Sequence, residues 1–361
     1  MTSCKLHLLN NGFKRSFNLW LQGWLNATIV LFVITGLGSV LIPSNVSANT
    51  DELKIKAGPR TGSFYPVTTA LRTLLHLKRD EDTSISLTIQ SSNGAIENMH
   101  ALLSGEADLA FVDASTIMAA ISAKPPFHKY DTVGSLRAIT PLWPQIGHFV
   151  IRKQDVKAGN LADYRDLLGE TVSFGSIASR SYEAAAHTFR GNGIYHDRLF
   201  KIPDLNEVET INSFERDLVN AFVLFTPEKD RRIIQALENK NNDAVLLNVS
   251  DVQLAKLNDG EIAVWERYVI PADTYNGQSQ AVNTIAQKNY LLVRDDFDPT
   301  LAKRIIKTIM DNTAFLETLH PPARHIRNQS TNQQYIVPPH AGVQLYFKEN
   351  PHCHTIFCLF N

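Results

Sequence analysis

Residues 58–66 read G-P-R-T-G-S-F-Y-P and concentrate groups that could bind a small anion. The stretch joins a strand-like run to a helical pattern, so backbone N–H groups at the helix N-terminus share one space and carry partial positive charge. Its side chains add a guanidinium, two hydroxyls and two aromatic rings: Arg60, Thr61, Ser63, Phe64 and Tyr65. An ordinary strand-to-helix turn, with glycine for geometry, is the alternative interpretation.

Two further polar turns follow strand-like segments. The strands predicted over 84–90 and 108–113 lead into the turns 91–94 and 113–116. With the strand over 53–57 they form a β-α-β-α-β pattern, which predicts a parallel sheet that binds ligands beyond the carboxyl ends of its strands. The candidate binding residues in these turns are Ser92, Asn93, Gly94 and Asp113.

A similar unit occurs later in the chain. A strand over 171–174 leads into a turn of small residues, and a helix is predicted over 182–190. The candidate binding residues of this turn are Ser176, Ser179, Arg180 and Ser181. Two anion-binding turns, one in each lobe, predict a cleft that holds a ligand between the lobes. Helix capping by the serines and a solvated Arg180 are the alternatives.

Aromatic residues near the predicted crossovers are further candidates. Trp143, between two prolines, could form the floor of the cleft with Phe64 and Tyr65, or it could pack at a hinge. Tyr275 lies near the return crossover, where it could set the hinge geometry.

The first 48 residues have the order of a secretory signal. Three basic residues and no acidic ones precede and flank an apolar run over 24–42, which is followed by Pro43 and the small-residue sequence V-S-A. This order predicts export with cleavage after Ala48. An uncleaved membrane anchor is the alternative, because the apolar run approaches the length that spans a bilayer.

The charge balance argues against a nucleic-acid-binding protein. The chain has 35 basic and 36 acidic side chains, and three of the basic ones lie in the predicted signal. The mature protein is therefore mildly acidic, and we expect no nucleic-acid partner. Its length of about 310 residues is enough for two lobes. No P-loop, H-E-x-x-H, G-x-S-x-G or C-x-x-C motif occurs, so neither an enzyme nor a cofactor is predicted.

Two cysteines remain after the predicted cleavage, and both lie in the C-terminal tail. Cys353 and Cys358 could form a disulfide in an oxidising compartment, or bind a soft metal together with His352 and His354. An unstructured tail is the third possibility. The spacing meets no zinc-ligand rule, so the tail or the disulfide is favoured and no metal site is predicted.

Six motifs, in order along the chain, resemble the TAXI-type solute receptors of TRAP transporters, which are type II periplasmic binding proteins. They are G-P-R-T-G-S-F-Y-P, N-G-A-I-E-N-M, G-E-A-D-L-A-F-V-D, L-A-D-Y-R-D-L-L-G-E-T-V-S-F-G, I-P-A-D-T-Y-N-G-Q and I-V-P-P-H-A-G-V-Q-L-Y-F. The resemblance covers most of the mature chain. It implies an α/β, two-lobed type II fold in which each lobe is a mostly parallel sheet flanked by helices, with the ligand cleft between the lobes.

The resemblance also implies a function. Such a receptor catches a small organic anion in the periplasm, an amino acid such as glutamate or a dicarboxylate, and delivers it to a TRAP-type membrane permease. We expect a monomer. A periplasmic sensor that acts through a membrane signalling partner is the alternative.

The expected organisation follows the motifs. After the signal, lobe 1 is expected to consist of residues 49–148 and 284–347, and lobe 2 of residues 149–283. A C-terminal tail is expected over 348–361. Residues 205–232 have no obvious counterpart in the family and are expected to be an insertion in lobe 2.

Three segments of the chain depart from the family pattern. The family usually reads T-G-G-S where this chain has residues 92–95, and it usually has glutamine in place of Asp113. It reads P-G-S-G-T where this chain has residues 177–181. There, Ala178 and Arg180 replace glycines, which limits how closely the backbone approaches a ligand but adds a guanidinium that can bind a carboxylate.

An amino-acid ligand would reconcile these departures. Its carboxylate would meet Arg60 or Arg180, and its ammonium would meet Asp113. This ligand hypothesis rests on sign complementarity alone.

Overall fold

The computed structural model describes residues 49–60, 62, 64–77, 83–130, 134–177, 179–238, 243–259, 263–327 and 335–351. Thr50–Asn361 form one compact unit. The described residues do not include the predicted signal or the two tail cysteines. They also exclude three residues of the candidate turns: Thr61, Ser63 and Ala178.

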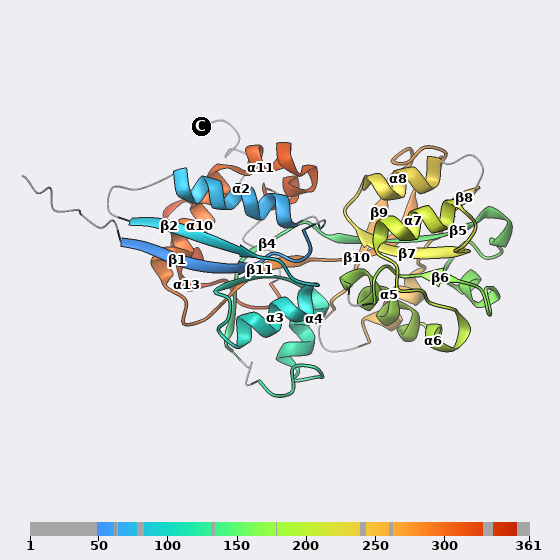
Figure 1. Ribbon diagram of the computed structural model, residues 1–361, viewed down its shortest axis with the longest axis horizontal. Helices are drawn as coiled ribbons and strands as arrows, with labels where there is room; N and C mark the ends of the chain where they lie inside the picture. Colours follow the sequence, from blue (N-terminus) through green and yellow to red (C-terminus); the bar gives the residue numbers. More distant parts are fainter. Residues whose placement is uncertain are drawn as a thin grey trace, which may run out of the picture. The chain divides into compact units, whose positions relative to one another are not determined.

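The first sheet contains five strands in the order β2-β1-β3-β11-β4 (Figure 1). Their bounds are β1 Asn49–Lys56, β2 Thr83–Gln90, β3 Leu109–Asp113, β4 Leu136–Pro141 and β11 Asn289–Arg294. β1 and β3 are parallel, as the β-α-β pattern predicts. β11 runs antiparallel to both of its neighbours, because it enters the sheet directly from β10 of the second sheet.

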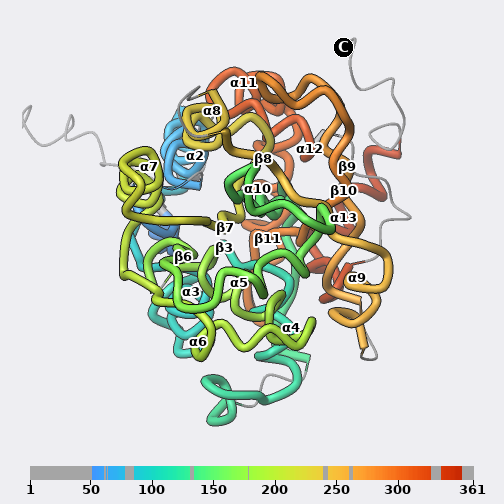
Figure 2. Tube along the Cα trace, turned by 90° about the vertical axis from the view of Figure 1, so that its right-hand side faces the viewer, coloured from blue at the N-terminus to red at the C-terminus, as the bar shows by residue number. Residues whose placement is uncertain are grey.

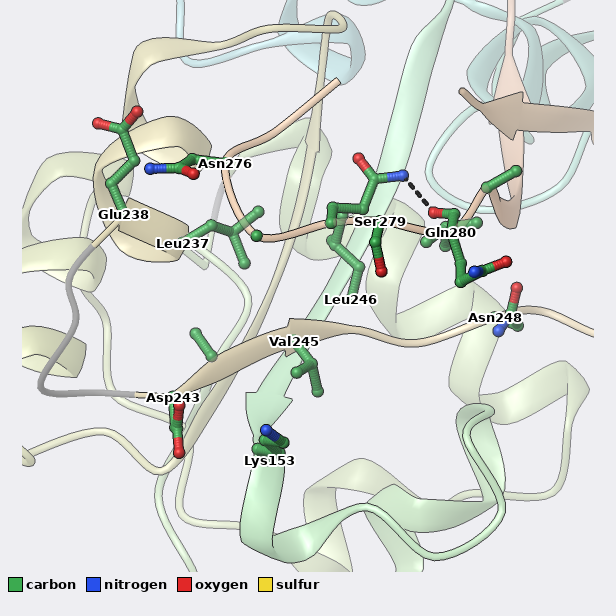
Figure 3. Close-up of a pocket in the computed structure, with 15 residues that line it drawn as sticks. Lys153, Leu237, Glu238, Asp243, Val245, Leu246, Asn248, Asn276, Ser279 and Gln280 are labelled. Atoms are coloured by element: carbon green, nitrogen blue, oxygen red, sulfur yellow. Dashed lines mark hydrogen bonds between the residues drawn. The ribbon is translucent and has the colours of Figure 1, made fainter. Parts of the chain in front are cut away.

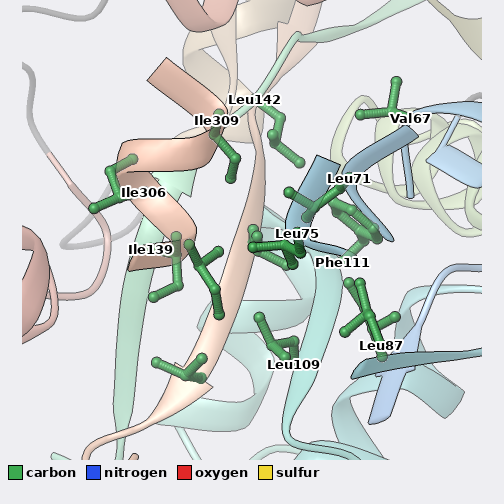
Figure 4. Close-up of a cluster of buried hydrophobic side chains, with 14 of the residues drawn as sticks. Val67, Leu71, Leu75, Leu87, Leu109, Phe111, Ile139, Leu142, Ile306 and Ile309 are labelled. Carbon is green, nitrogen blue, oxygen red and sulfur yellow. The ribbon is translucent and has the colours of Figure 1, made fainter. Parts of the chain in front are cut away.

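Helices cover both faces of this sheet. One face carries α2 (Phe64–Leu77), α10 (Pro299–Asp311), α11 (Thr313–Leu319) and α13 (Ala341–Glu349). The short helix α12 (Arg324–Arg327) contributes to the same core. The opposite face carries α3 (Ala95–Leu103) and α4 (Ala114–Ile121). In α2, apolar residues at every fourth position, Val67, Leu71 and Leu75, pack on the strands (Figure 4). This burial fixes the helix whose first residue is Phe64.

The second sheet has the order β6-β7-β5-β10-β9, and β8 also pairs with β5. The bounds are β5 Gln145–Arg152, β6 Val172–Ser173, β7 Ala221–Thr226, β8 Ala244–Leu246, β9 Glu266–Ile270 and β10 Val282–Gln287. Among the described strand pairs of this sheet, β6–β7 is parallel and the others are antiparallel. The expectation of a mostly parallel sheet is wrong here. The chain enters the second sheet along β5 and leaves it along β10 for the first sheet, so these two neighbouring strands run in opposite directions.

Helices also cover both faces of the second sheet. α5 (Arg180–Gly191), α6 (His196–Leu199) and α9 (Asp251–Leu257) belong to one face, and α7 (Glu207–Glu215) and α8 (Arg231–Glu238) belong to the other. Figure 2 shows α7 and α8 above β7, with α5 and α6 below it. Two short 3₁₀ segments, Lys153–Asp155 and Leu161–Asp166, connect β5 to β6. The predicted two-lobed α/β fold is confirmed, with two sheets that are each flanked by helices.

Residues 205–232 do not form a peripheral insertion. They contain α7 and β7, and β7 lies inside the sheet with β6 on one side and β5 on the other. All six residues of β7 are buried. The run A-F-V-L-F-T is therefore a core strand, and its continuous apolar sequence is what a strand buried on both faces requires.

The chain passes from the first sheet to the second between Pro141 and Gln145, and it returns at Lys288. β5 and β10 thus extend across the boundaries that were expected at residues 148 and 283. Among the described residues, no helix combines the length and the apolar character needed to cross a membrane.

Candidate functional site

The Arg180 guanidinium joins elements of the two sheets. Its Nη1 donates a hydrogen bond to Asn289 Oδ1 over 3.1 Å, and its Cζ lies 4.4 Å from the centre of the Phe64 ring. Arg180 is the first residue of α5 in the second sheet, whereas Phe64 begins α2 and Asn289 begins β11 in the first. The structure therefore brings together Phe64 and Arg180, which the sequence places in two separate turns.

The charged guanidinium of Arg180 is partly shielded from water. Burial lowers the pKa of its guanidinium, and the carboxylates of Asp113 and Glu207 act in the opposite direction. An arginine starts from so high a pKa that it stays charged at neutral pH. Apart from the bond to Asn289, its guanidinium makes no hydrogen bond or ion pair with the described residues. Its remaining N–H groups are available to an oxyanion.

Aromatic rings continue from Phe64 toward the crossover. Phe64 stacks on Phe111 with centroids 4.7 Å apart, and it contacts the Trp143 ring at 5.2 Å. Trp143 in turn contacts His320, with ring centroids 4.5 Å apart. The Asn289 amide, which accepts from Arg180, donates to the Trp143 carbonyl over 2.8 Å. These contacts define one continuous cluster, which we call the crossover cluster: Phe64, Trp143, Arg180, Asn289 and His320.

Asp113 is buried and caps α4. Its carboxylate accepts hydrogen bonds from Thr116 N at 2.9 Å, Ser115 Oγ at 2.6 Å and Thr116 Oγ1 at 3.1 Å. Only 3 % of Asp113 is exposed. These bonds account for the buried charge without a ligand, because a helix N-terminus stabilises a carboxylate. The field of Asp113 still reaches Arg180.

The turn over 91–94 holds the start of α3. The Ser92 hydroxyl donates to Asn98 Oδ1, and Asn93 N donates to Glu97 Oε2 over 2.9 Å. Gly94 has a φ of 152°, a conformation that favours glycine, and it immediately precedes the helix. The Ser92 hydroxyl and the Asn93 backbone N–H thus bond to residues of α3.

The three serines of the second turn also bond within the chain. Ser179 accepts from Tyr182 N over 3.2 Å, which confirms that it caps α5. Ser176 donates to Asp204 over 3.1 Å. Ser181 accepts from Phe225 N over 3.0 Å and so ties α5 to β7. These bonds position Arg180 at the helix start.

Arg60 and Tyr65 lie apart from Arg180 in the network of contacts. The exposed Arg60 guanidinium lies 6.0 Å from the centre of the Tyr65 ring. Tyr65 packs on the first core. Among the described residues, no contact joins Arg60 to the crossover cluster.

Sequence reasoning did not single out Asn289 or His320 as site residues. Asn289 is a polar side chain at the start of an otherwise apolar strand, directly after the return crossover, and that position was a usable signal. His320 follows α11 by one residue, and nothing in its spacing indicates the cleft.

A separate pocket of about 480 Å³ lies in the second sheet's part of the chain (Figure 3). Its walls come from β8 and from residues 276–282, and Lys153, Asp243 and Asn248 are among its polar residues. It contains none of the predicted binding residues. Its described lining has no buried polar side-chain atom without a partner, whereas the crossover cluster has two, Trp143 Nε1 and His320 Nε2. We therefore favour the crossover cluster as the ligand site.

The described residues also offer no metal centre: nowhere among them do three or more His, Cys, Asp or Glu side chains gather so that they could hold an ion.

Comparison with known proteins identifies a family and several solved structures that this chain resembles. The model of the NMT1-like family matches residues 55–350. The periplasmic aliphatic sulphonate binding protein SsuA from Escherichia coli is 15 % identical, with 84 % of this chain and 94 % of that chain covered and a TM-score of 0.42. A TctC solute binding protein from Polaromonas is 12 % identical, with 79 % and 88 % covered and a TM-score of 0.44.

Proposed function

The chain belongs to the NMT1-like family, and we propose that it is an extracytoplasmic solute receptor that binds a small organic anion between its two sheets. The observation that carries the proposal is Arg180, whose guanidinium contacts Phe64 and Asn289 of the first sheet's part from the start of α5. A binding protein, and not an enzyme, is also what the sequence predicts, and the family and the descriptions of similar structures agree.

The physical basis is the set of donors that Arg180 leaves uncommitted. A guanidinium has five N–H donors in a planar fork, and the described residues use Nη1. The first turn of α5 adds the partial positive charge of its N-terminus beside the same side chain. A carboxylate held here would contact both sheets, since Phe64 and Asn289 belong to the first.

The delivery partner follows from the TAXI resemblance. We propose a TRAP-type permease as the membrane partner, an amino acid such as glutamate or a dicarboxylate as the ligand, and a monomeric receptor. The basic, apolar and small-residue order of residues 1–48 supports export to the periplasm with a cleaved signal. The division into two lobes is part of this proposal, with the chain passing between them at residues 142–144 and at Lys288.

Calorimetric titration of the purified protein tests the proposal. We expect at least one of succinate, 2-oxoglutarate and glutamate to bind, and we expect Arg180→Ala to weaken that binding by about tenfold or more, because a charge-assisted hydrogen bond is lost. Arg198→Ala is the matched control, since it removes another arginine that lies 5.5 Å from the centre of a tyrosine ring, on the exposed surface of α6. Binding of none of the three anions, or equal affinity in both variants, would overturn the proposal.

A further inference from the structure

Two buried donors at the crossover have no hydrogen-bond partner in the protein. They are Trp143 Nε1, in a residue that is 0 % exposed, and Gln145 Nε2, in a residue that is 4 % exposed. An indole N–H can only donate. Leaving such a donor buried and unpaired costs about 1–3 kcal/mol, so native proteins rarely tolerate it without a purpose.

The position of Trp143 connects this orphaned donor to Arg180. The Trp143 ring lies against Phe64, the same ring that stacks under Arg180. The Trp143 carbonyl is held by the Asn289 amide, whose oxygen accepts from Arg180. The unpaired Trp143 N–H and the Arg180 guanidinium therefore belong to one cluster.

His320 contributes a third polar atom without a partner. Its Nε2 is buried and unpaired, and its ring contacts Trp143 at 4.5 Å. Burial lowers the pKa of His320 to about 4, although the Asp230 carboxylate tends to raise it, so the ring is neutral at physiological pH. A neutral imidazole can donate from Nε2.

Three carboxylates whose fields reach Arg180, His320 or His148, namely Asp113, Asp230 and Glu228, are by contrast already engaged. Asp113 accepts three bonds from the start of α4. Asp230 accepts from Arg232 through Nε at 2.8 Å, Nη2 at 2.6 Å and the backbone N at 2.9 Å. Glu228 accepts from the Tyr268 hydroxyl at 2.6 Å and pairs with Arg324 at 3.4 Å. An ammonium group would find these acceptors occupied.

We propose that Trp143 Nε1 and His320 Nε2, which belong to two rings in contact, form a donor subsite for a second oxygen of the ligand whose carboxylate binds Arg180. The inference rests on the proposed function and refines its ligand class: a dicarboxylate or oxo acid is preferred to an amino acid. Donors that face a ligand oxygen are satisfied on binding, whereas donors that face an ammonium stay unpaired, and the site discriminates by that difference.

The ligand class is tested with a matched pair of probes. 2-Oxoglutarate and glutamate share five carbons and two carboxylates, and they differ at C2, where a keto oxygen replaces an ammonium. We expect the purified protein to bind 2-oxoglutarate at least tenfold more tightly than glutamate in calorimetric titrations. Equal or tighter binding of glutamate would overturn the inference while leaving the receptor function intact. Binding of neither probe, nor of succinate, would overturn both.

The subsite itself is tested by Trp143→Phe, which removes the N–H and keeps an aromatic ring. We expect a five- to tenfold loss of 2-oxoglutarate affinity. Trp265→Phe is the control, because Trp265 Nε1 donates to His187 Nδ1 over 3.2 Å inside the protein, away from the cluster. Its affinity should match that of the unaltered protein. If Trp143→Phe fails to fold, His320→Phe removes the other donor of the subsite and keeps an aromatic ring against Trp143, so it should weaken 2-oxoglutarate binding to a comparable extent. Unchanged affinity in a folded variant at position 143 or 320 contradicts the subsite.

Discussion

The Arg180 guanidinium stacks on the Phe64 ring at 4.4 Å, so the first residue of α5 meets the first residue of α2. A cation–π contact of this kind contributes about 0.5–2 kcal/mol. The Phe64 ring is in turn stacked on Phe111. The charge that we assign to ligand binding is thus in contact with an aromatic pair of the opposite sheet.

Arg180→Lys tests whether geometry or charge matters more. Lysine keeps the positive charge but has no planar fork, so it loses both the stacking on Phe64 and the shape that matches a carboxylate. We expect the affinity for the bound anion to fall about tenfold, which calorimetry would measure. The lost contact with Phe64 should lower the free energy of unfolding by no more than about 2 kcal/mol, so the variant should remain folded. An affinity equal to that of the unaltered protein would show that charge alone is sufficient.

The sequence predicts the first sheet well because apolar residues repeat along its strands and helices with the period of each element. The strand with Ile85, Leu87 and Ile89 on one face and the helix of Val67, Leu71 and Leu75 both occur where they were expected. These patterns reflect burial on one side, which local sequence records directly.

The second sheet and the site depend on long-range pairing, which local sequence does not record. The strand β7 is apolar throughout, so no alternation marks its faces, and its central place follows only from pairing with β5 and β6. Asn289 and Arg180 are 109 residues apart, and their contact requires both crossovers to form. Ser181 looked like a ligand hydroxyl, but it bonds to a strand backbone that the sequence had assigned to an insertion.

Asp163, in the motif L-A-D-Y-R-D, provides a stability test. The residue is 2 % exposed, and its carboxylate accepts from the backbone N–H groups of Lys157 at 3.1 Å, Ala158 at 2.7 Å and Gly159 at 2.8 Å. Asp163→Ala leaves three donors unsatisfied, so we expect the free energy of unfolding in urea to fall by about 3 kcal/mol. Asp166→Ala removes a surface ion pair to Lys157 and should cost less than about 1 kcal/mol. Equal losses would refute the role of Asp163.

Gly342 tests the close approach of α13 to α10. A Cβ at this position would lie 2.1 Å from the Pro299 carbonyl oxygen and 2.9 Å from Lys303 N, both of which are backbone atoms. Gly342→Ala must push the two helices apart, so we expect a loss of about 2–3 kcal/mol in the free energy of unfolding. Gly191→Ala is the comparison, because its Cβ would meet the flexible end of Leu257 at 2.7 Å. Its loss should be clearly smaller, and a reversed order would contradict the packing argument.

His148 predicts how stability changes with pH. The side chain is 0 % exposed, accepts from the Tyr275 hydroxyl at Nε2 over 2.7 Å and donates from Nδ1 to the Ile146 carbonyl over 2.9 Å. Burial lowers its pKa from 6.5 to about 4, against the opposing fields of Asp230 and Glu228. The unfolded chain therefore binds one more proton than the folded protein between pH 4 and 6.5.

Because the unfolded chain binds more protons in this pH range, the folded protein loses stability as the pH falls. The stabilisation by neutral His148 is fully present above pH 6.5 and is lost as the pH falls toward 4, by about 3 kcal/mol in all. His148→Gln keeps a polar side chain but does not titrate, so urea unfolding of this variant should depend less steeply on pH across that window. The ordinary carboxylates titrate alike in both proteins, and the difference between the two curves isolates the histidine. Parallel curves would show that His148 takes up its proton at the same pH in the folded protein as in the unfolded chain, and they would contradict a lowered pKa for this histidine.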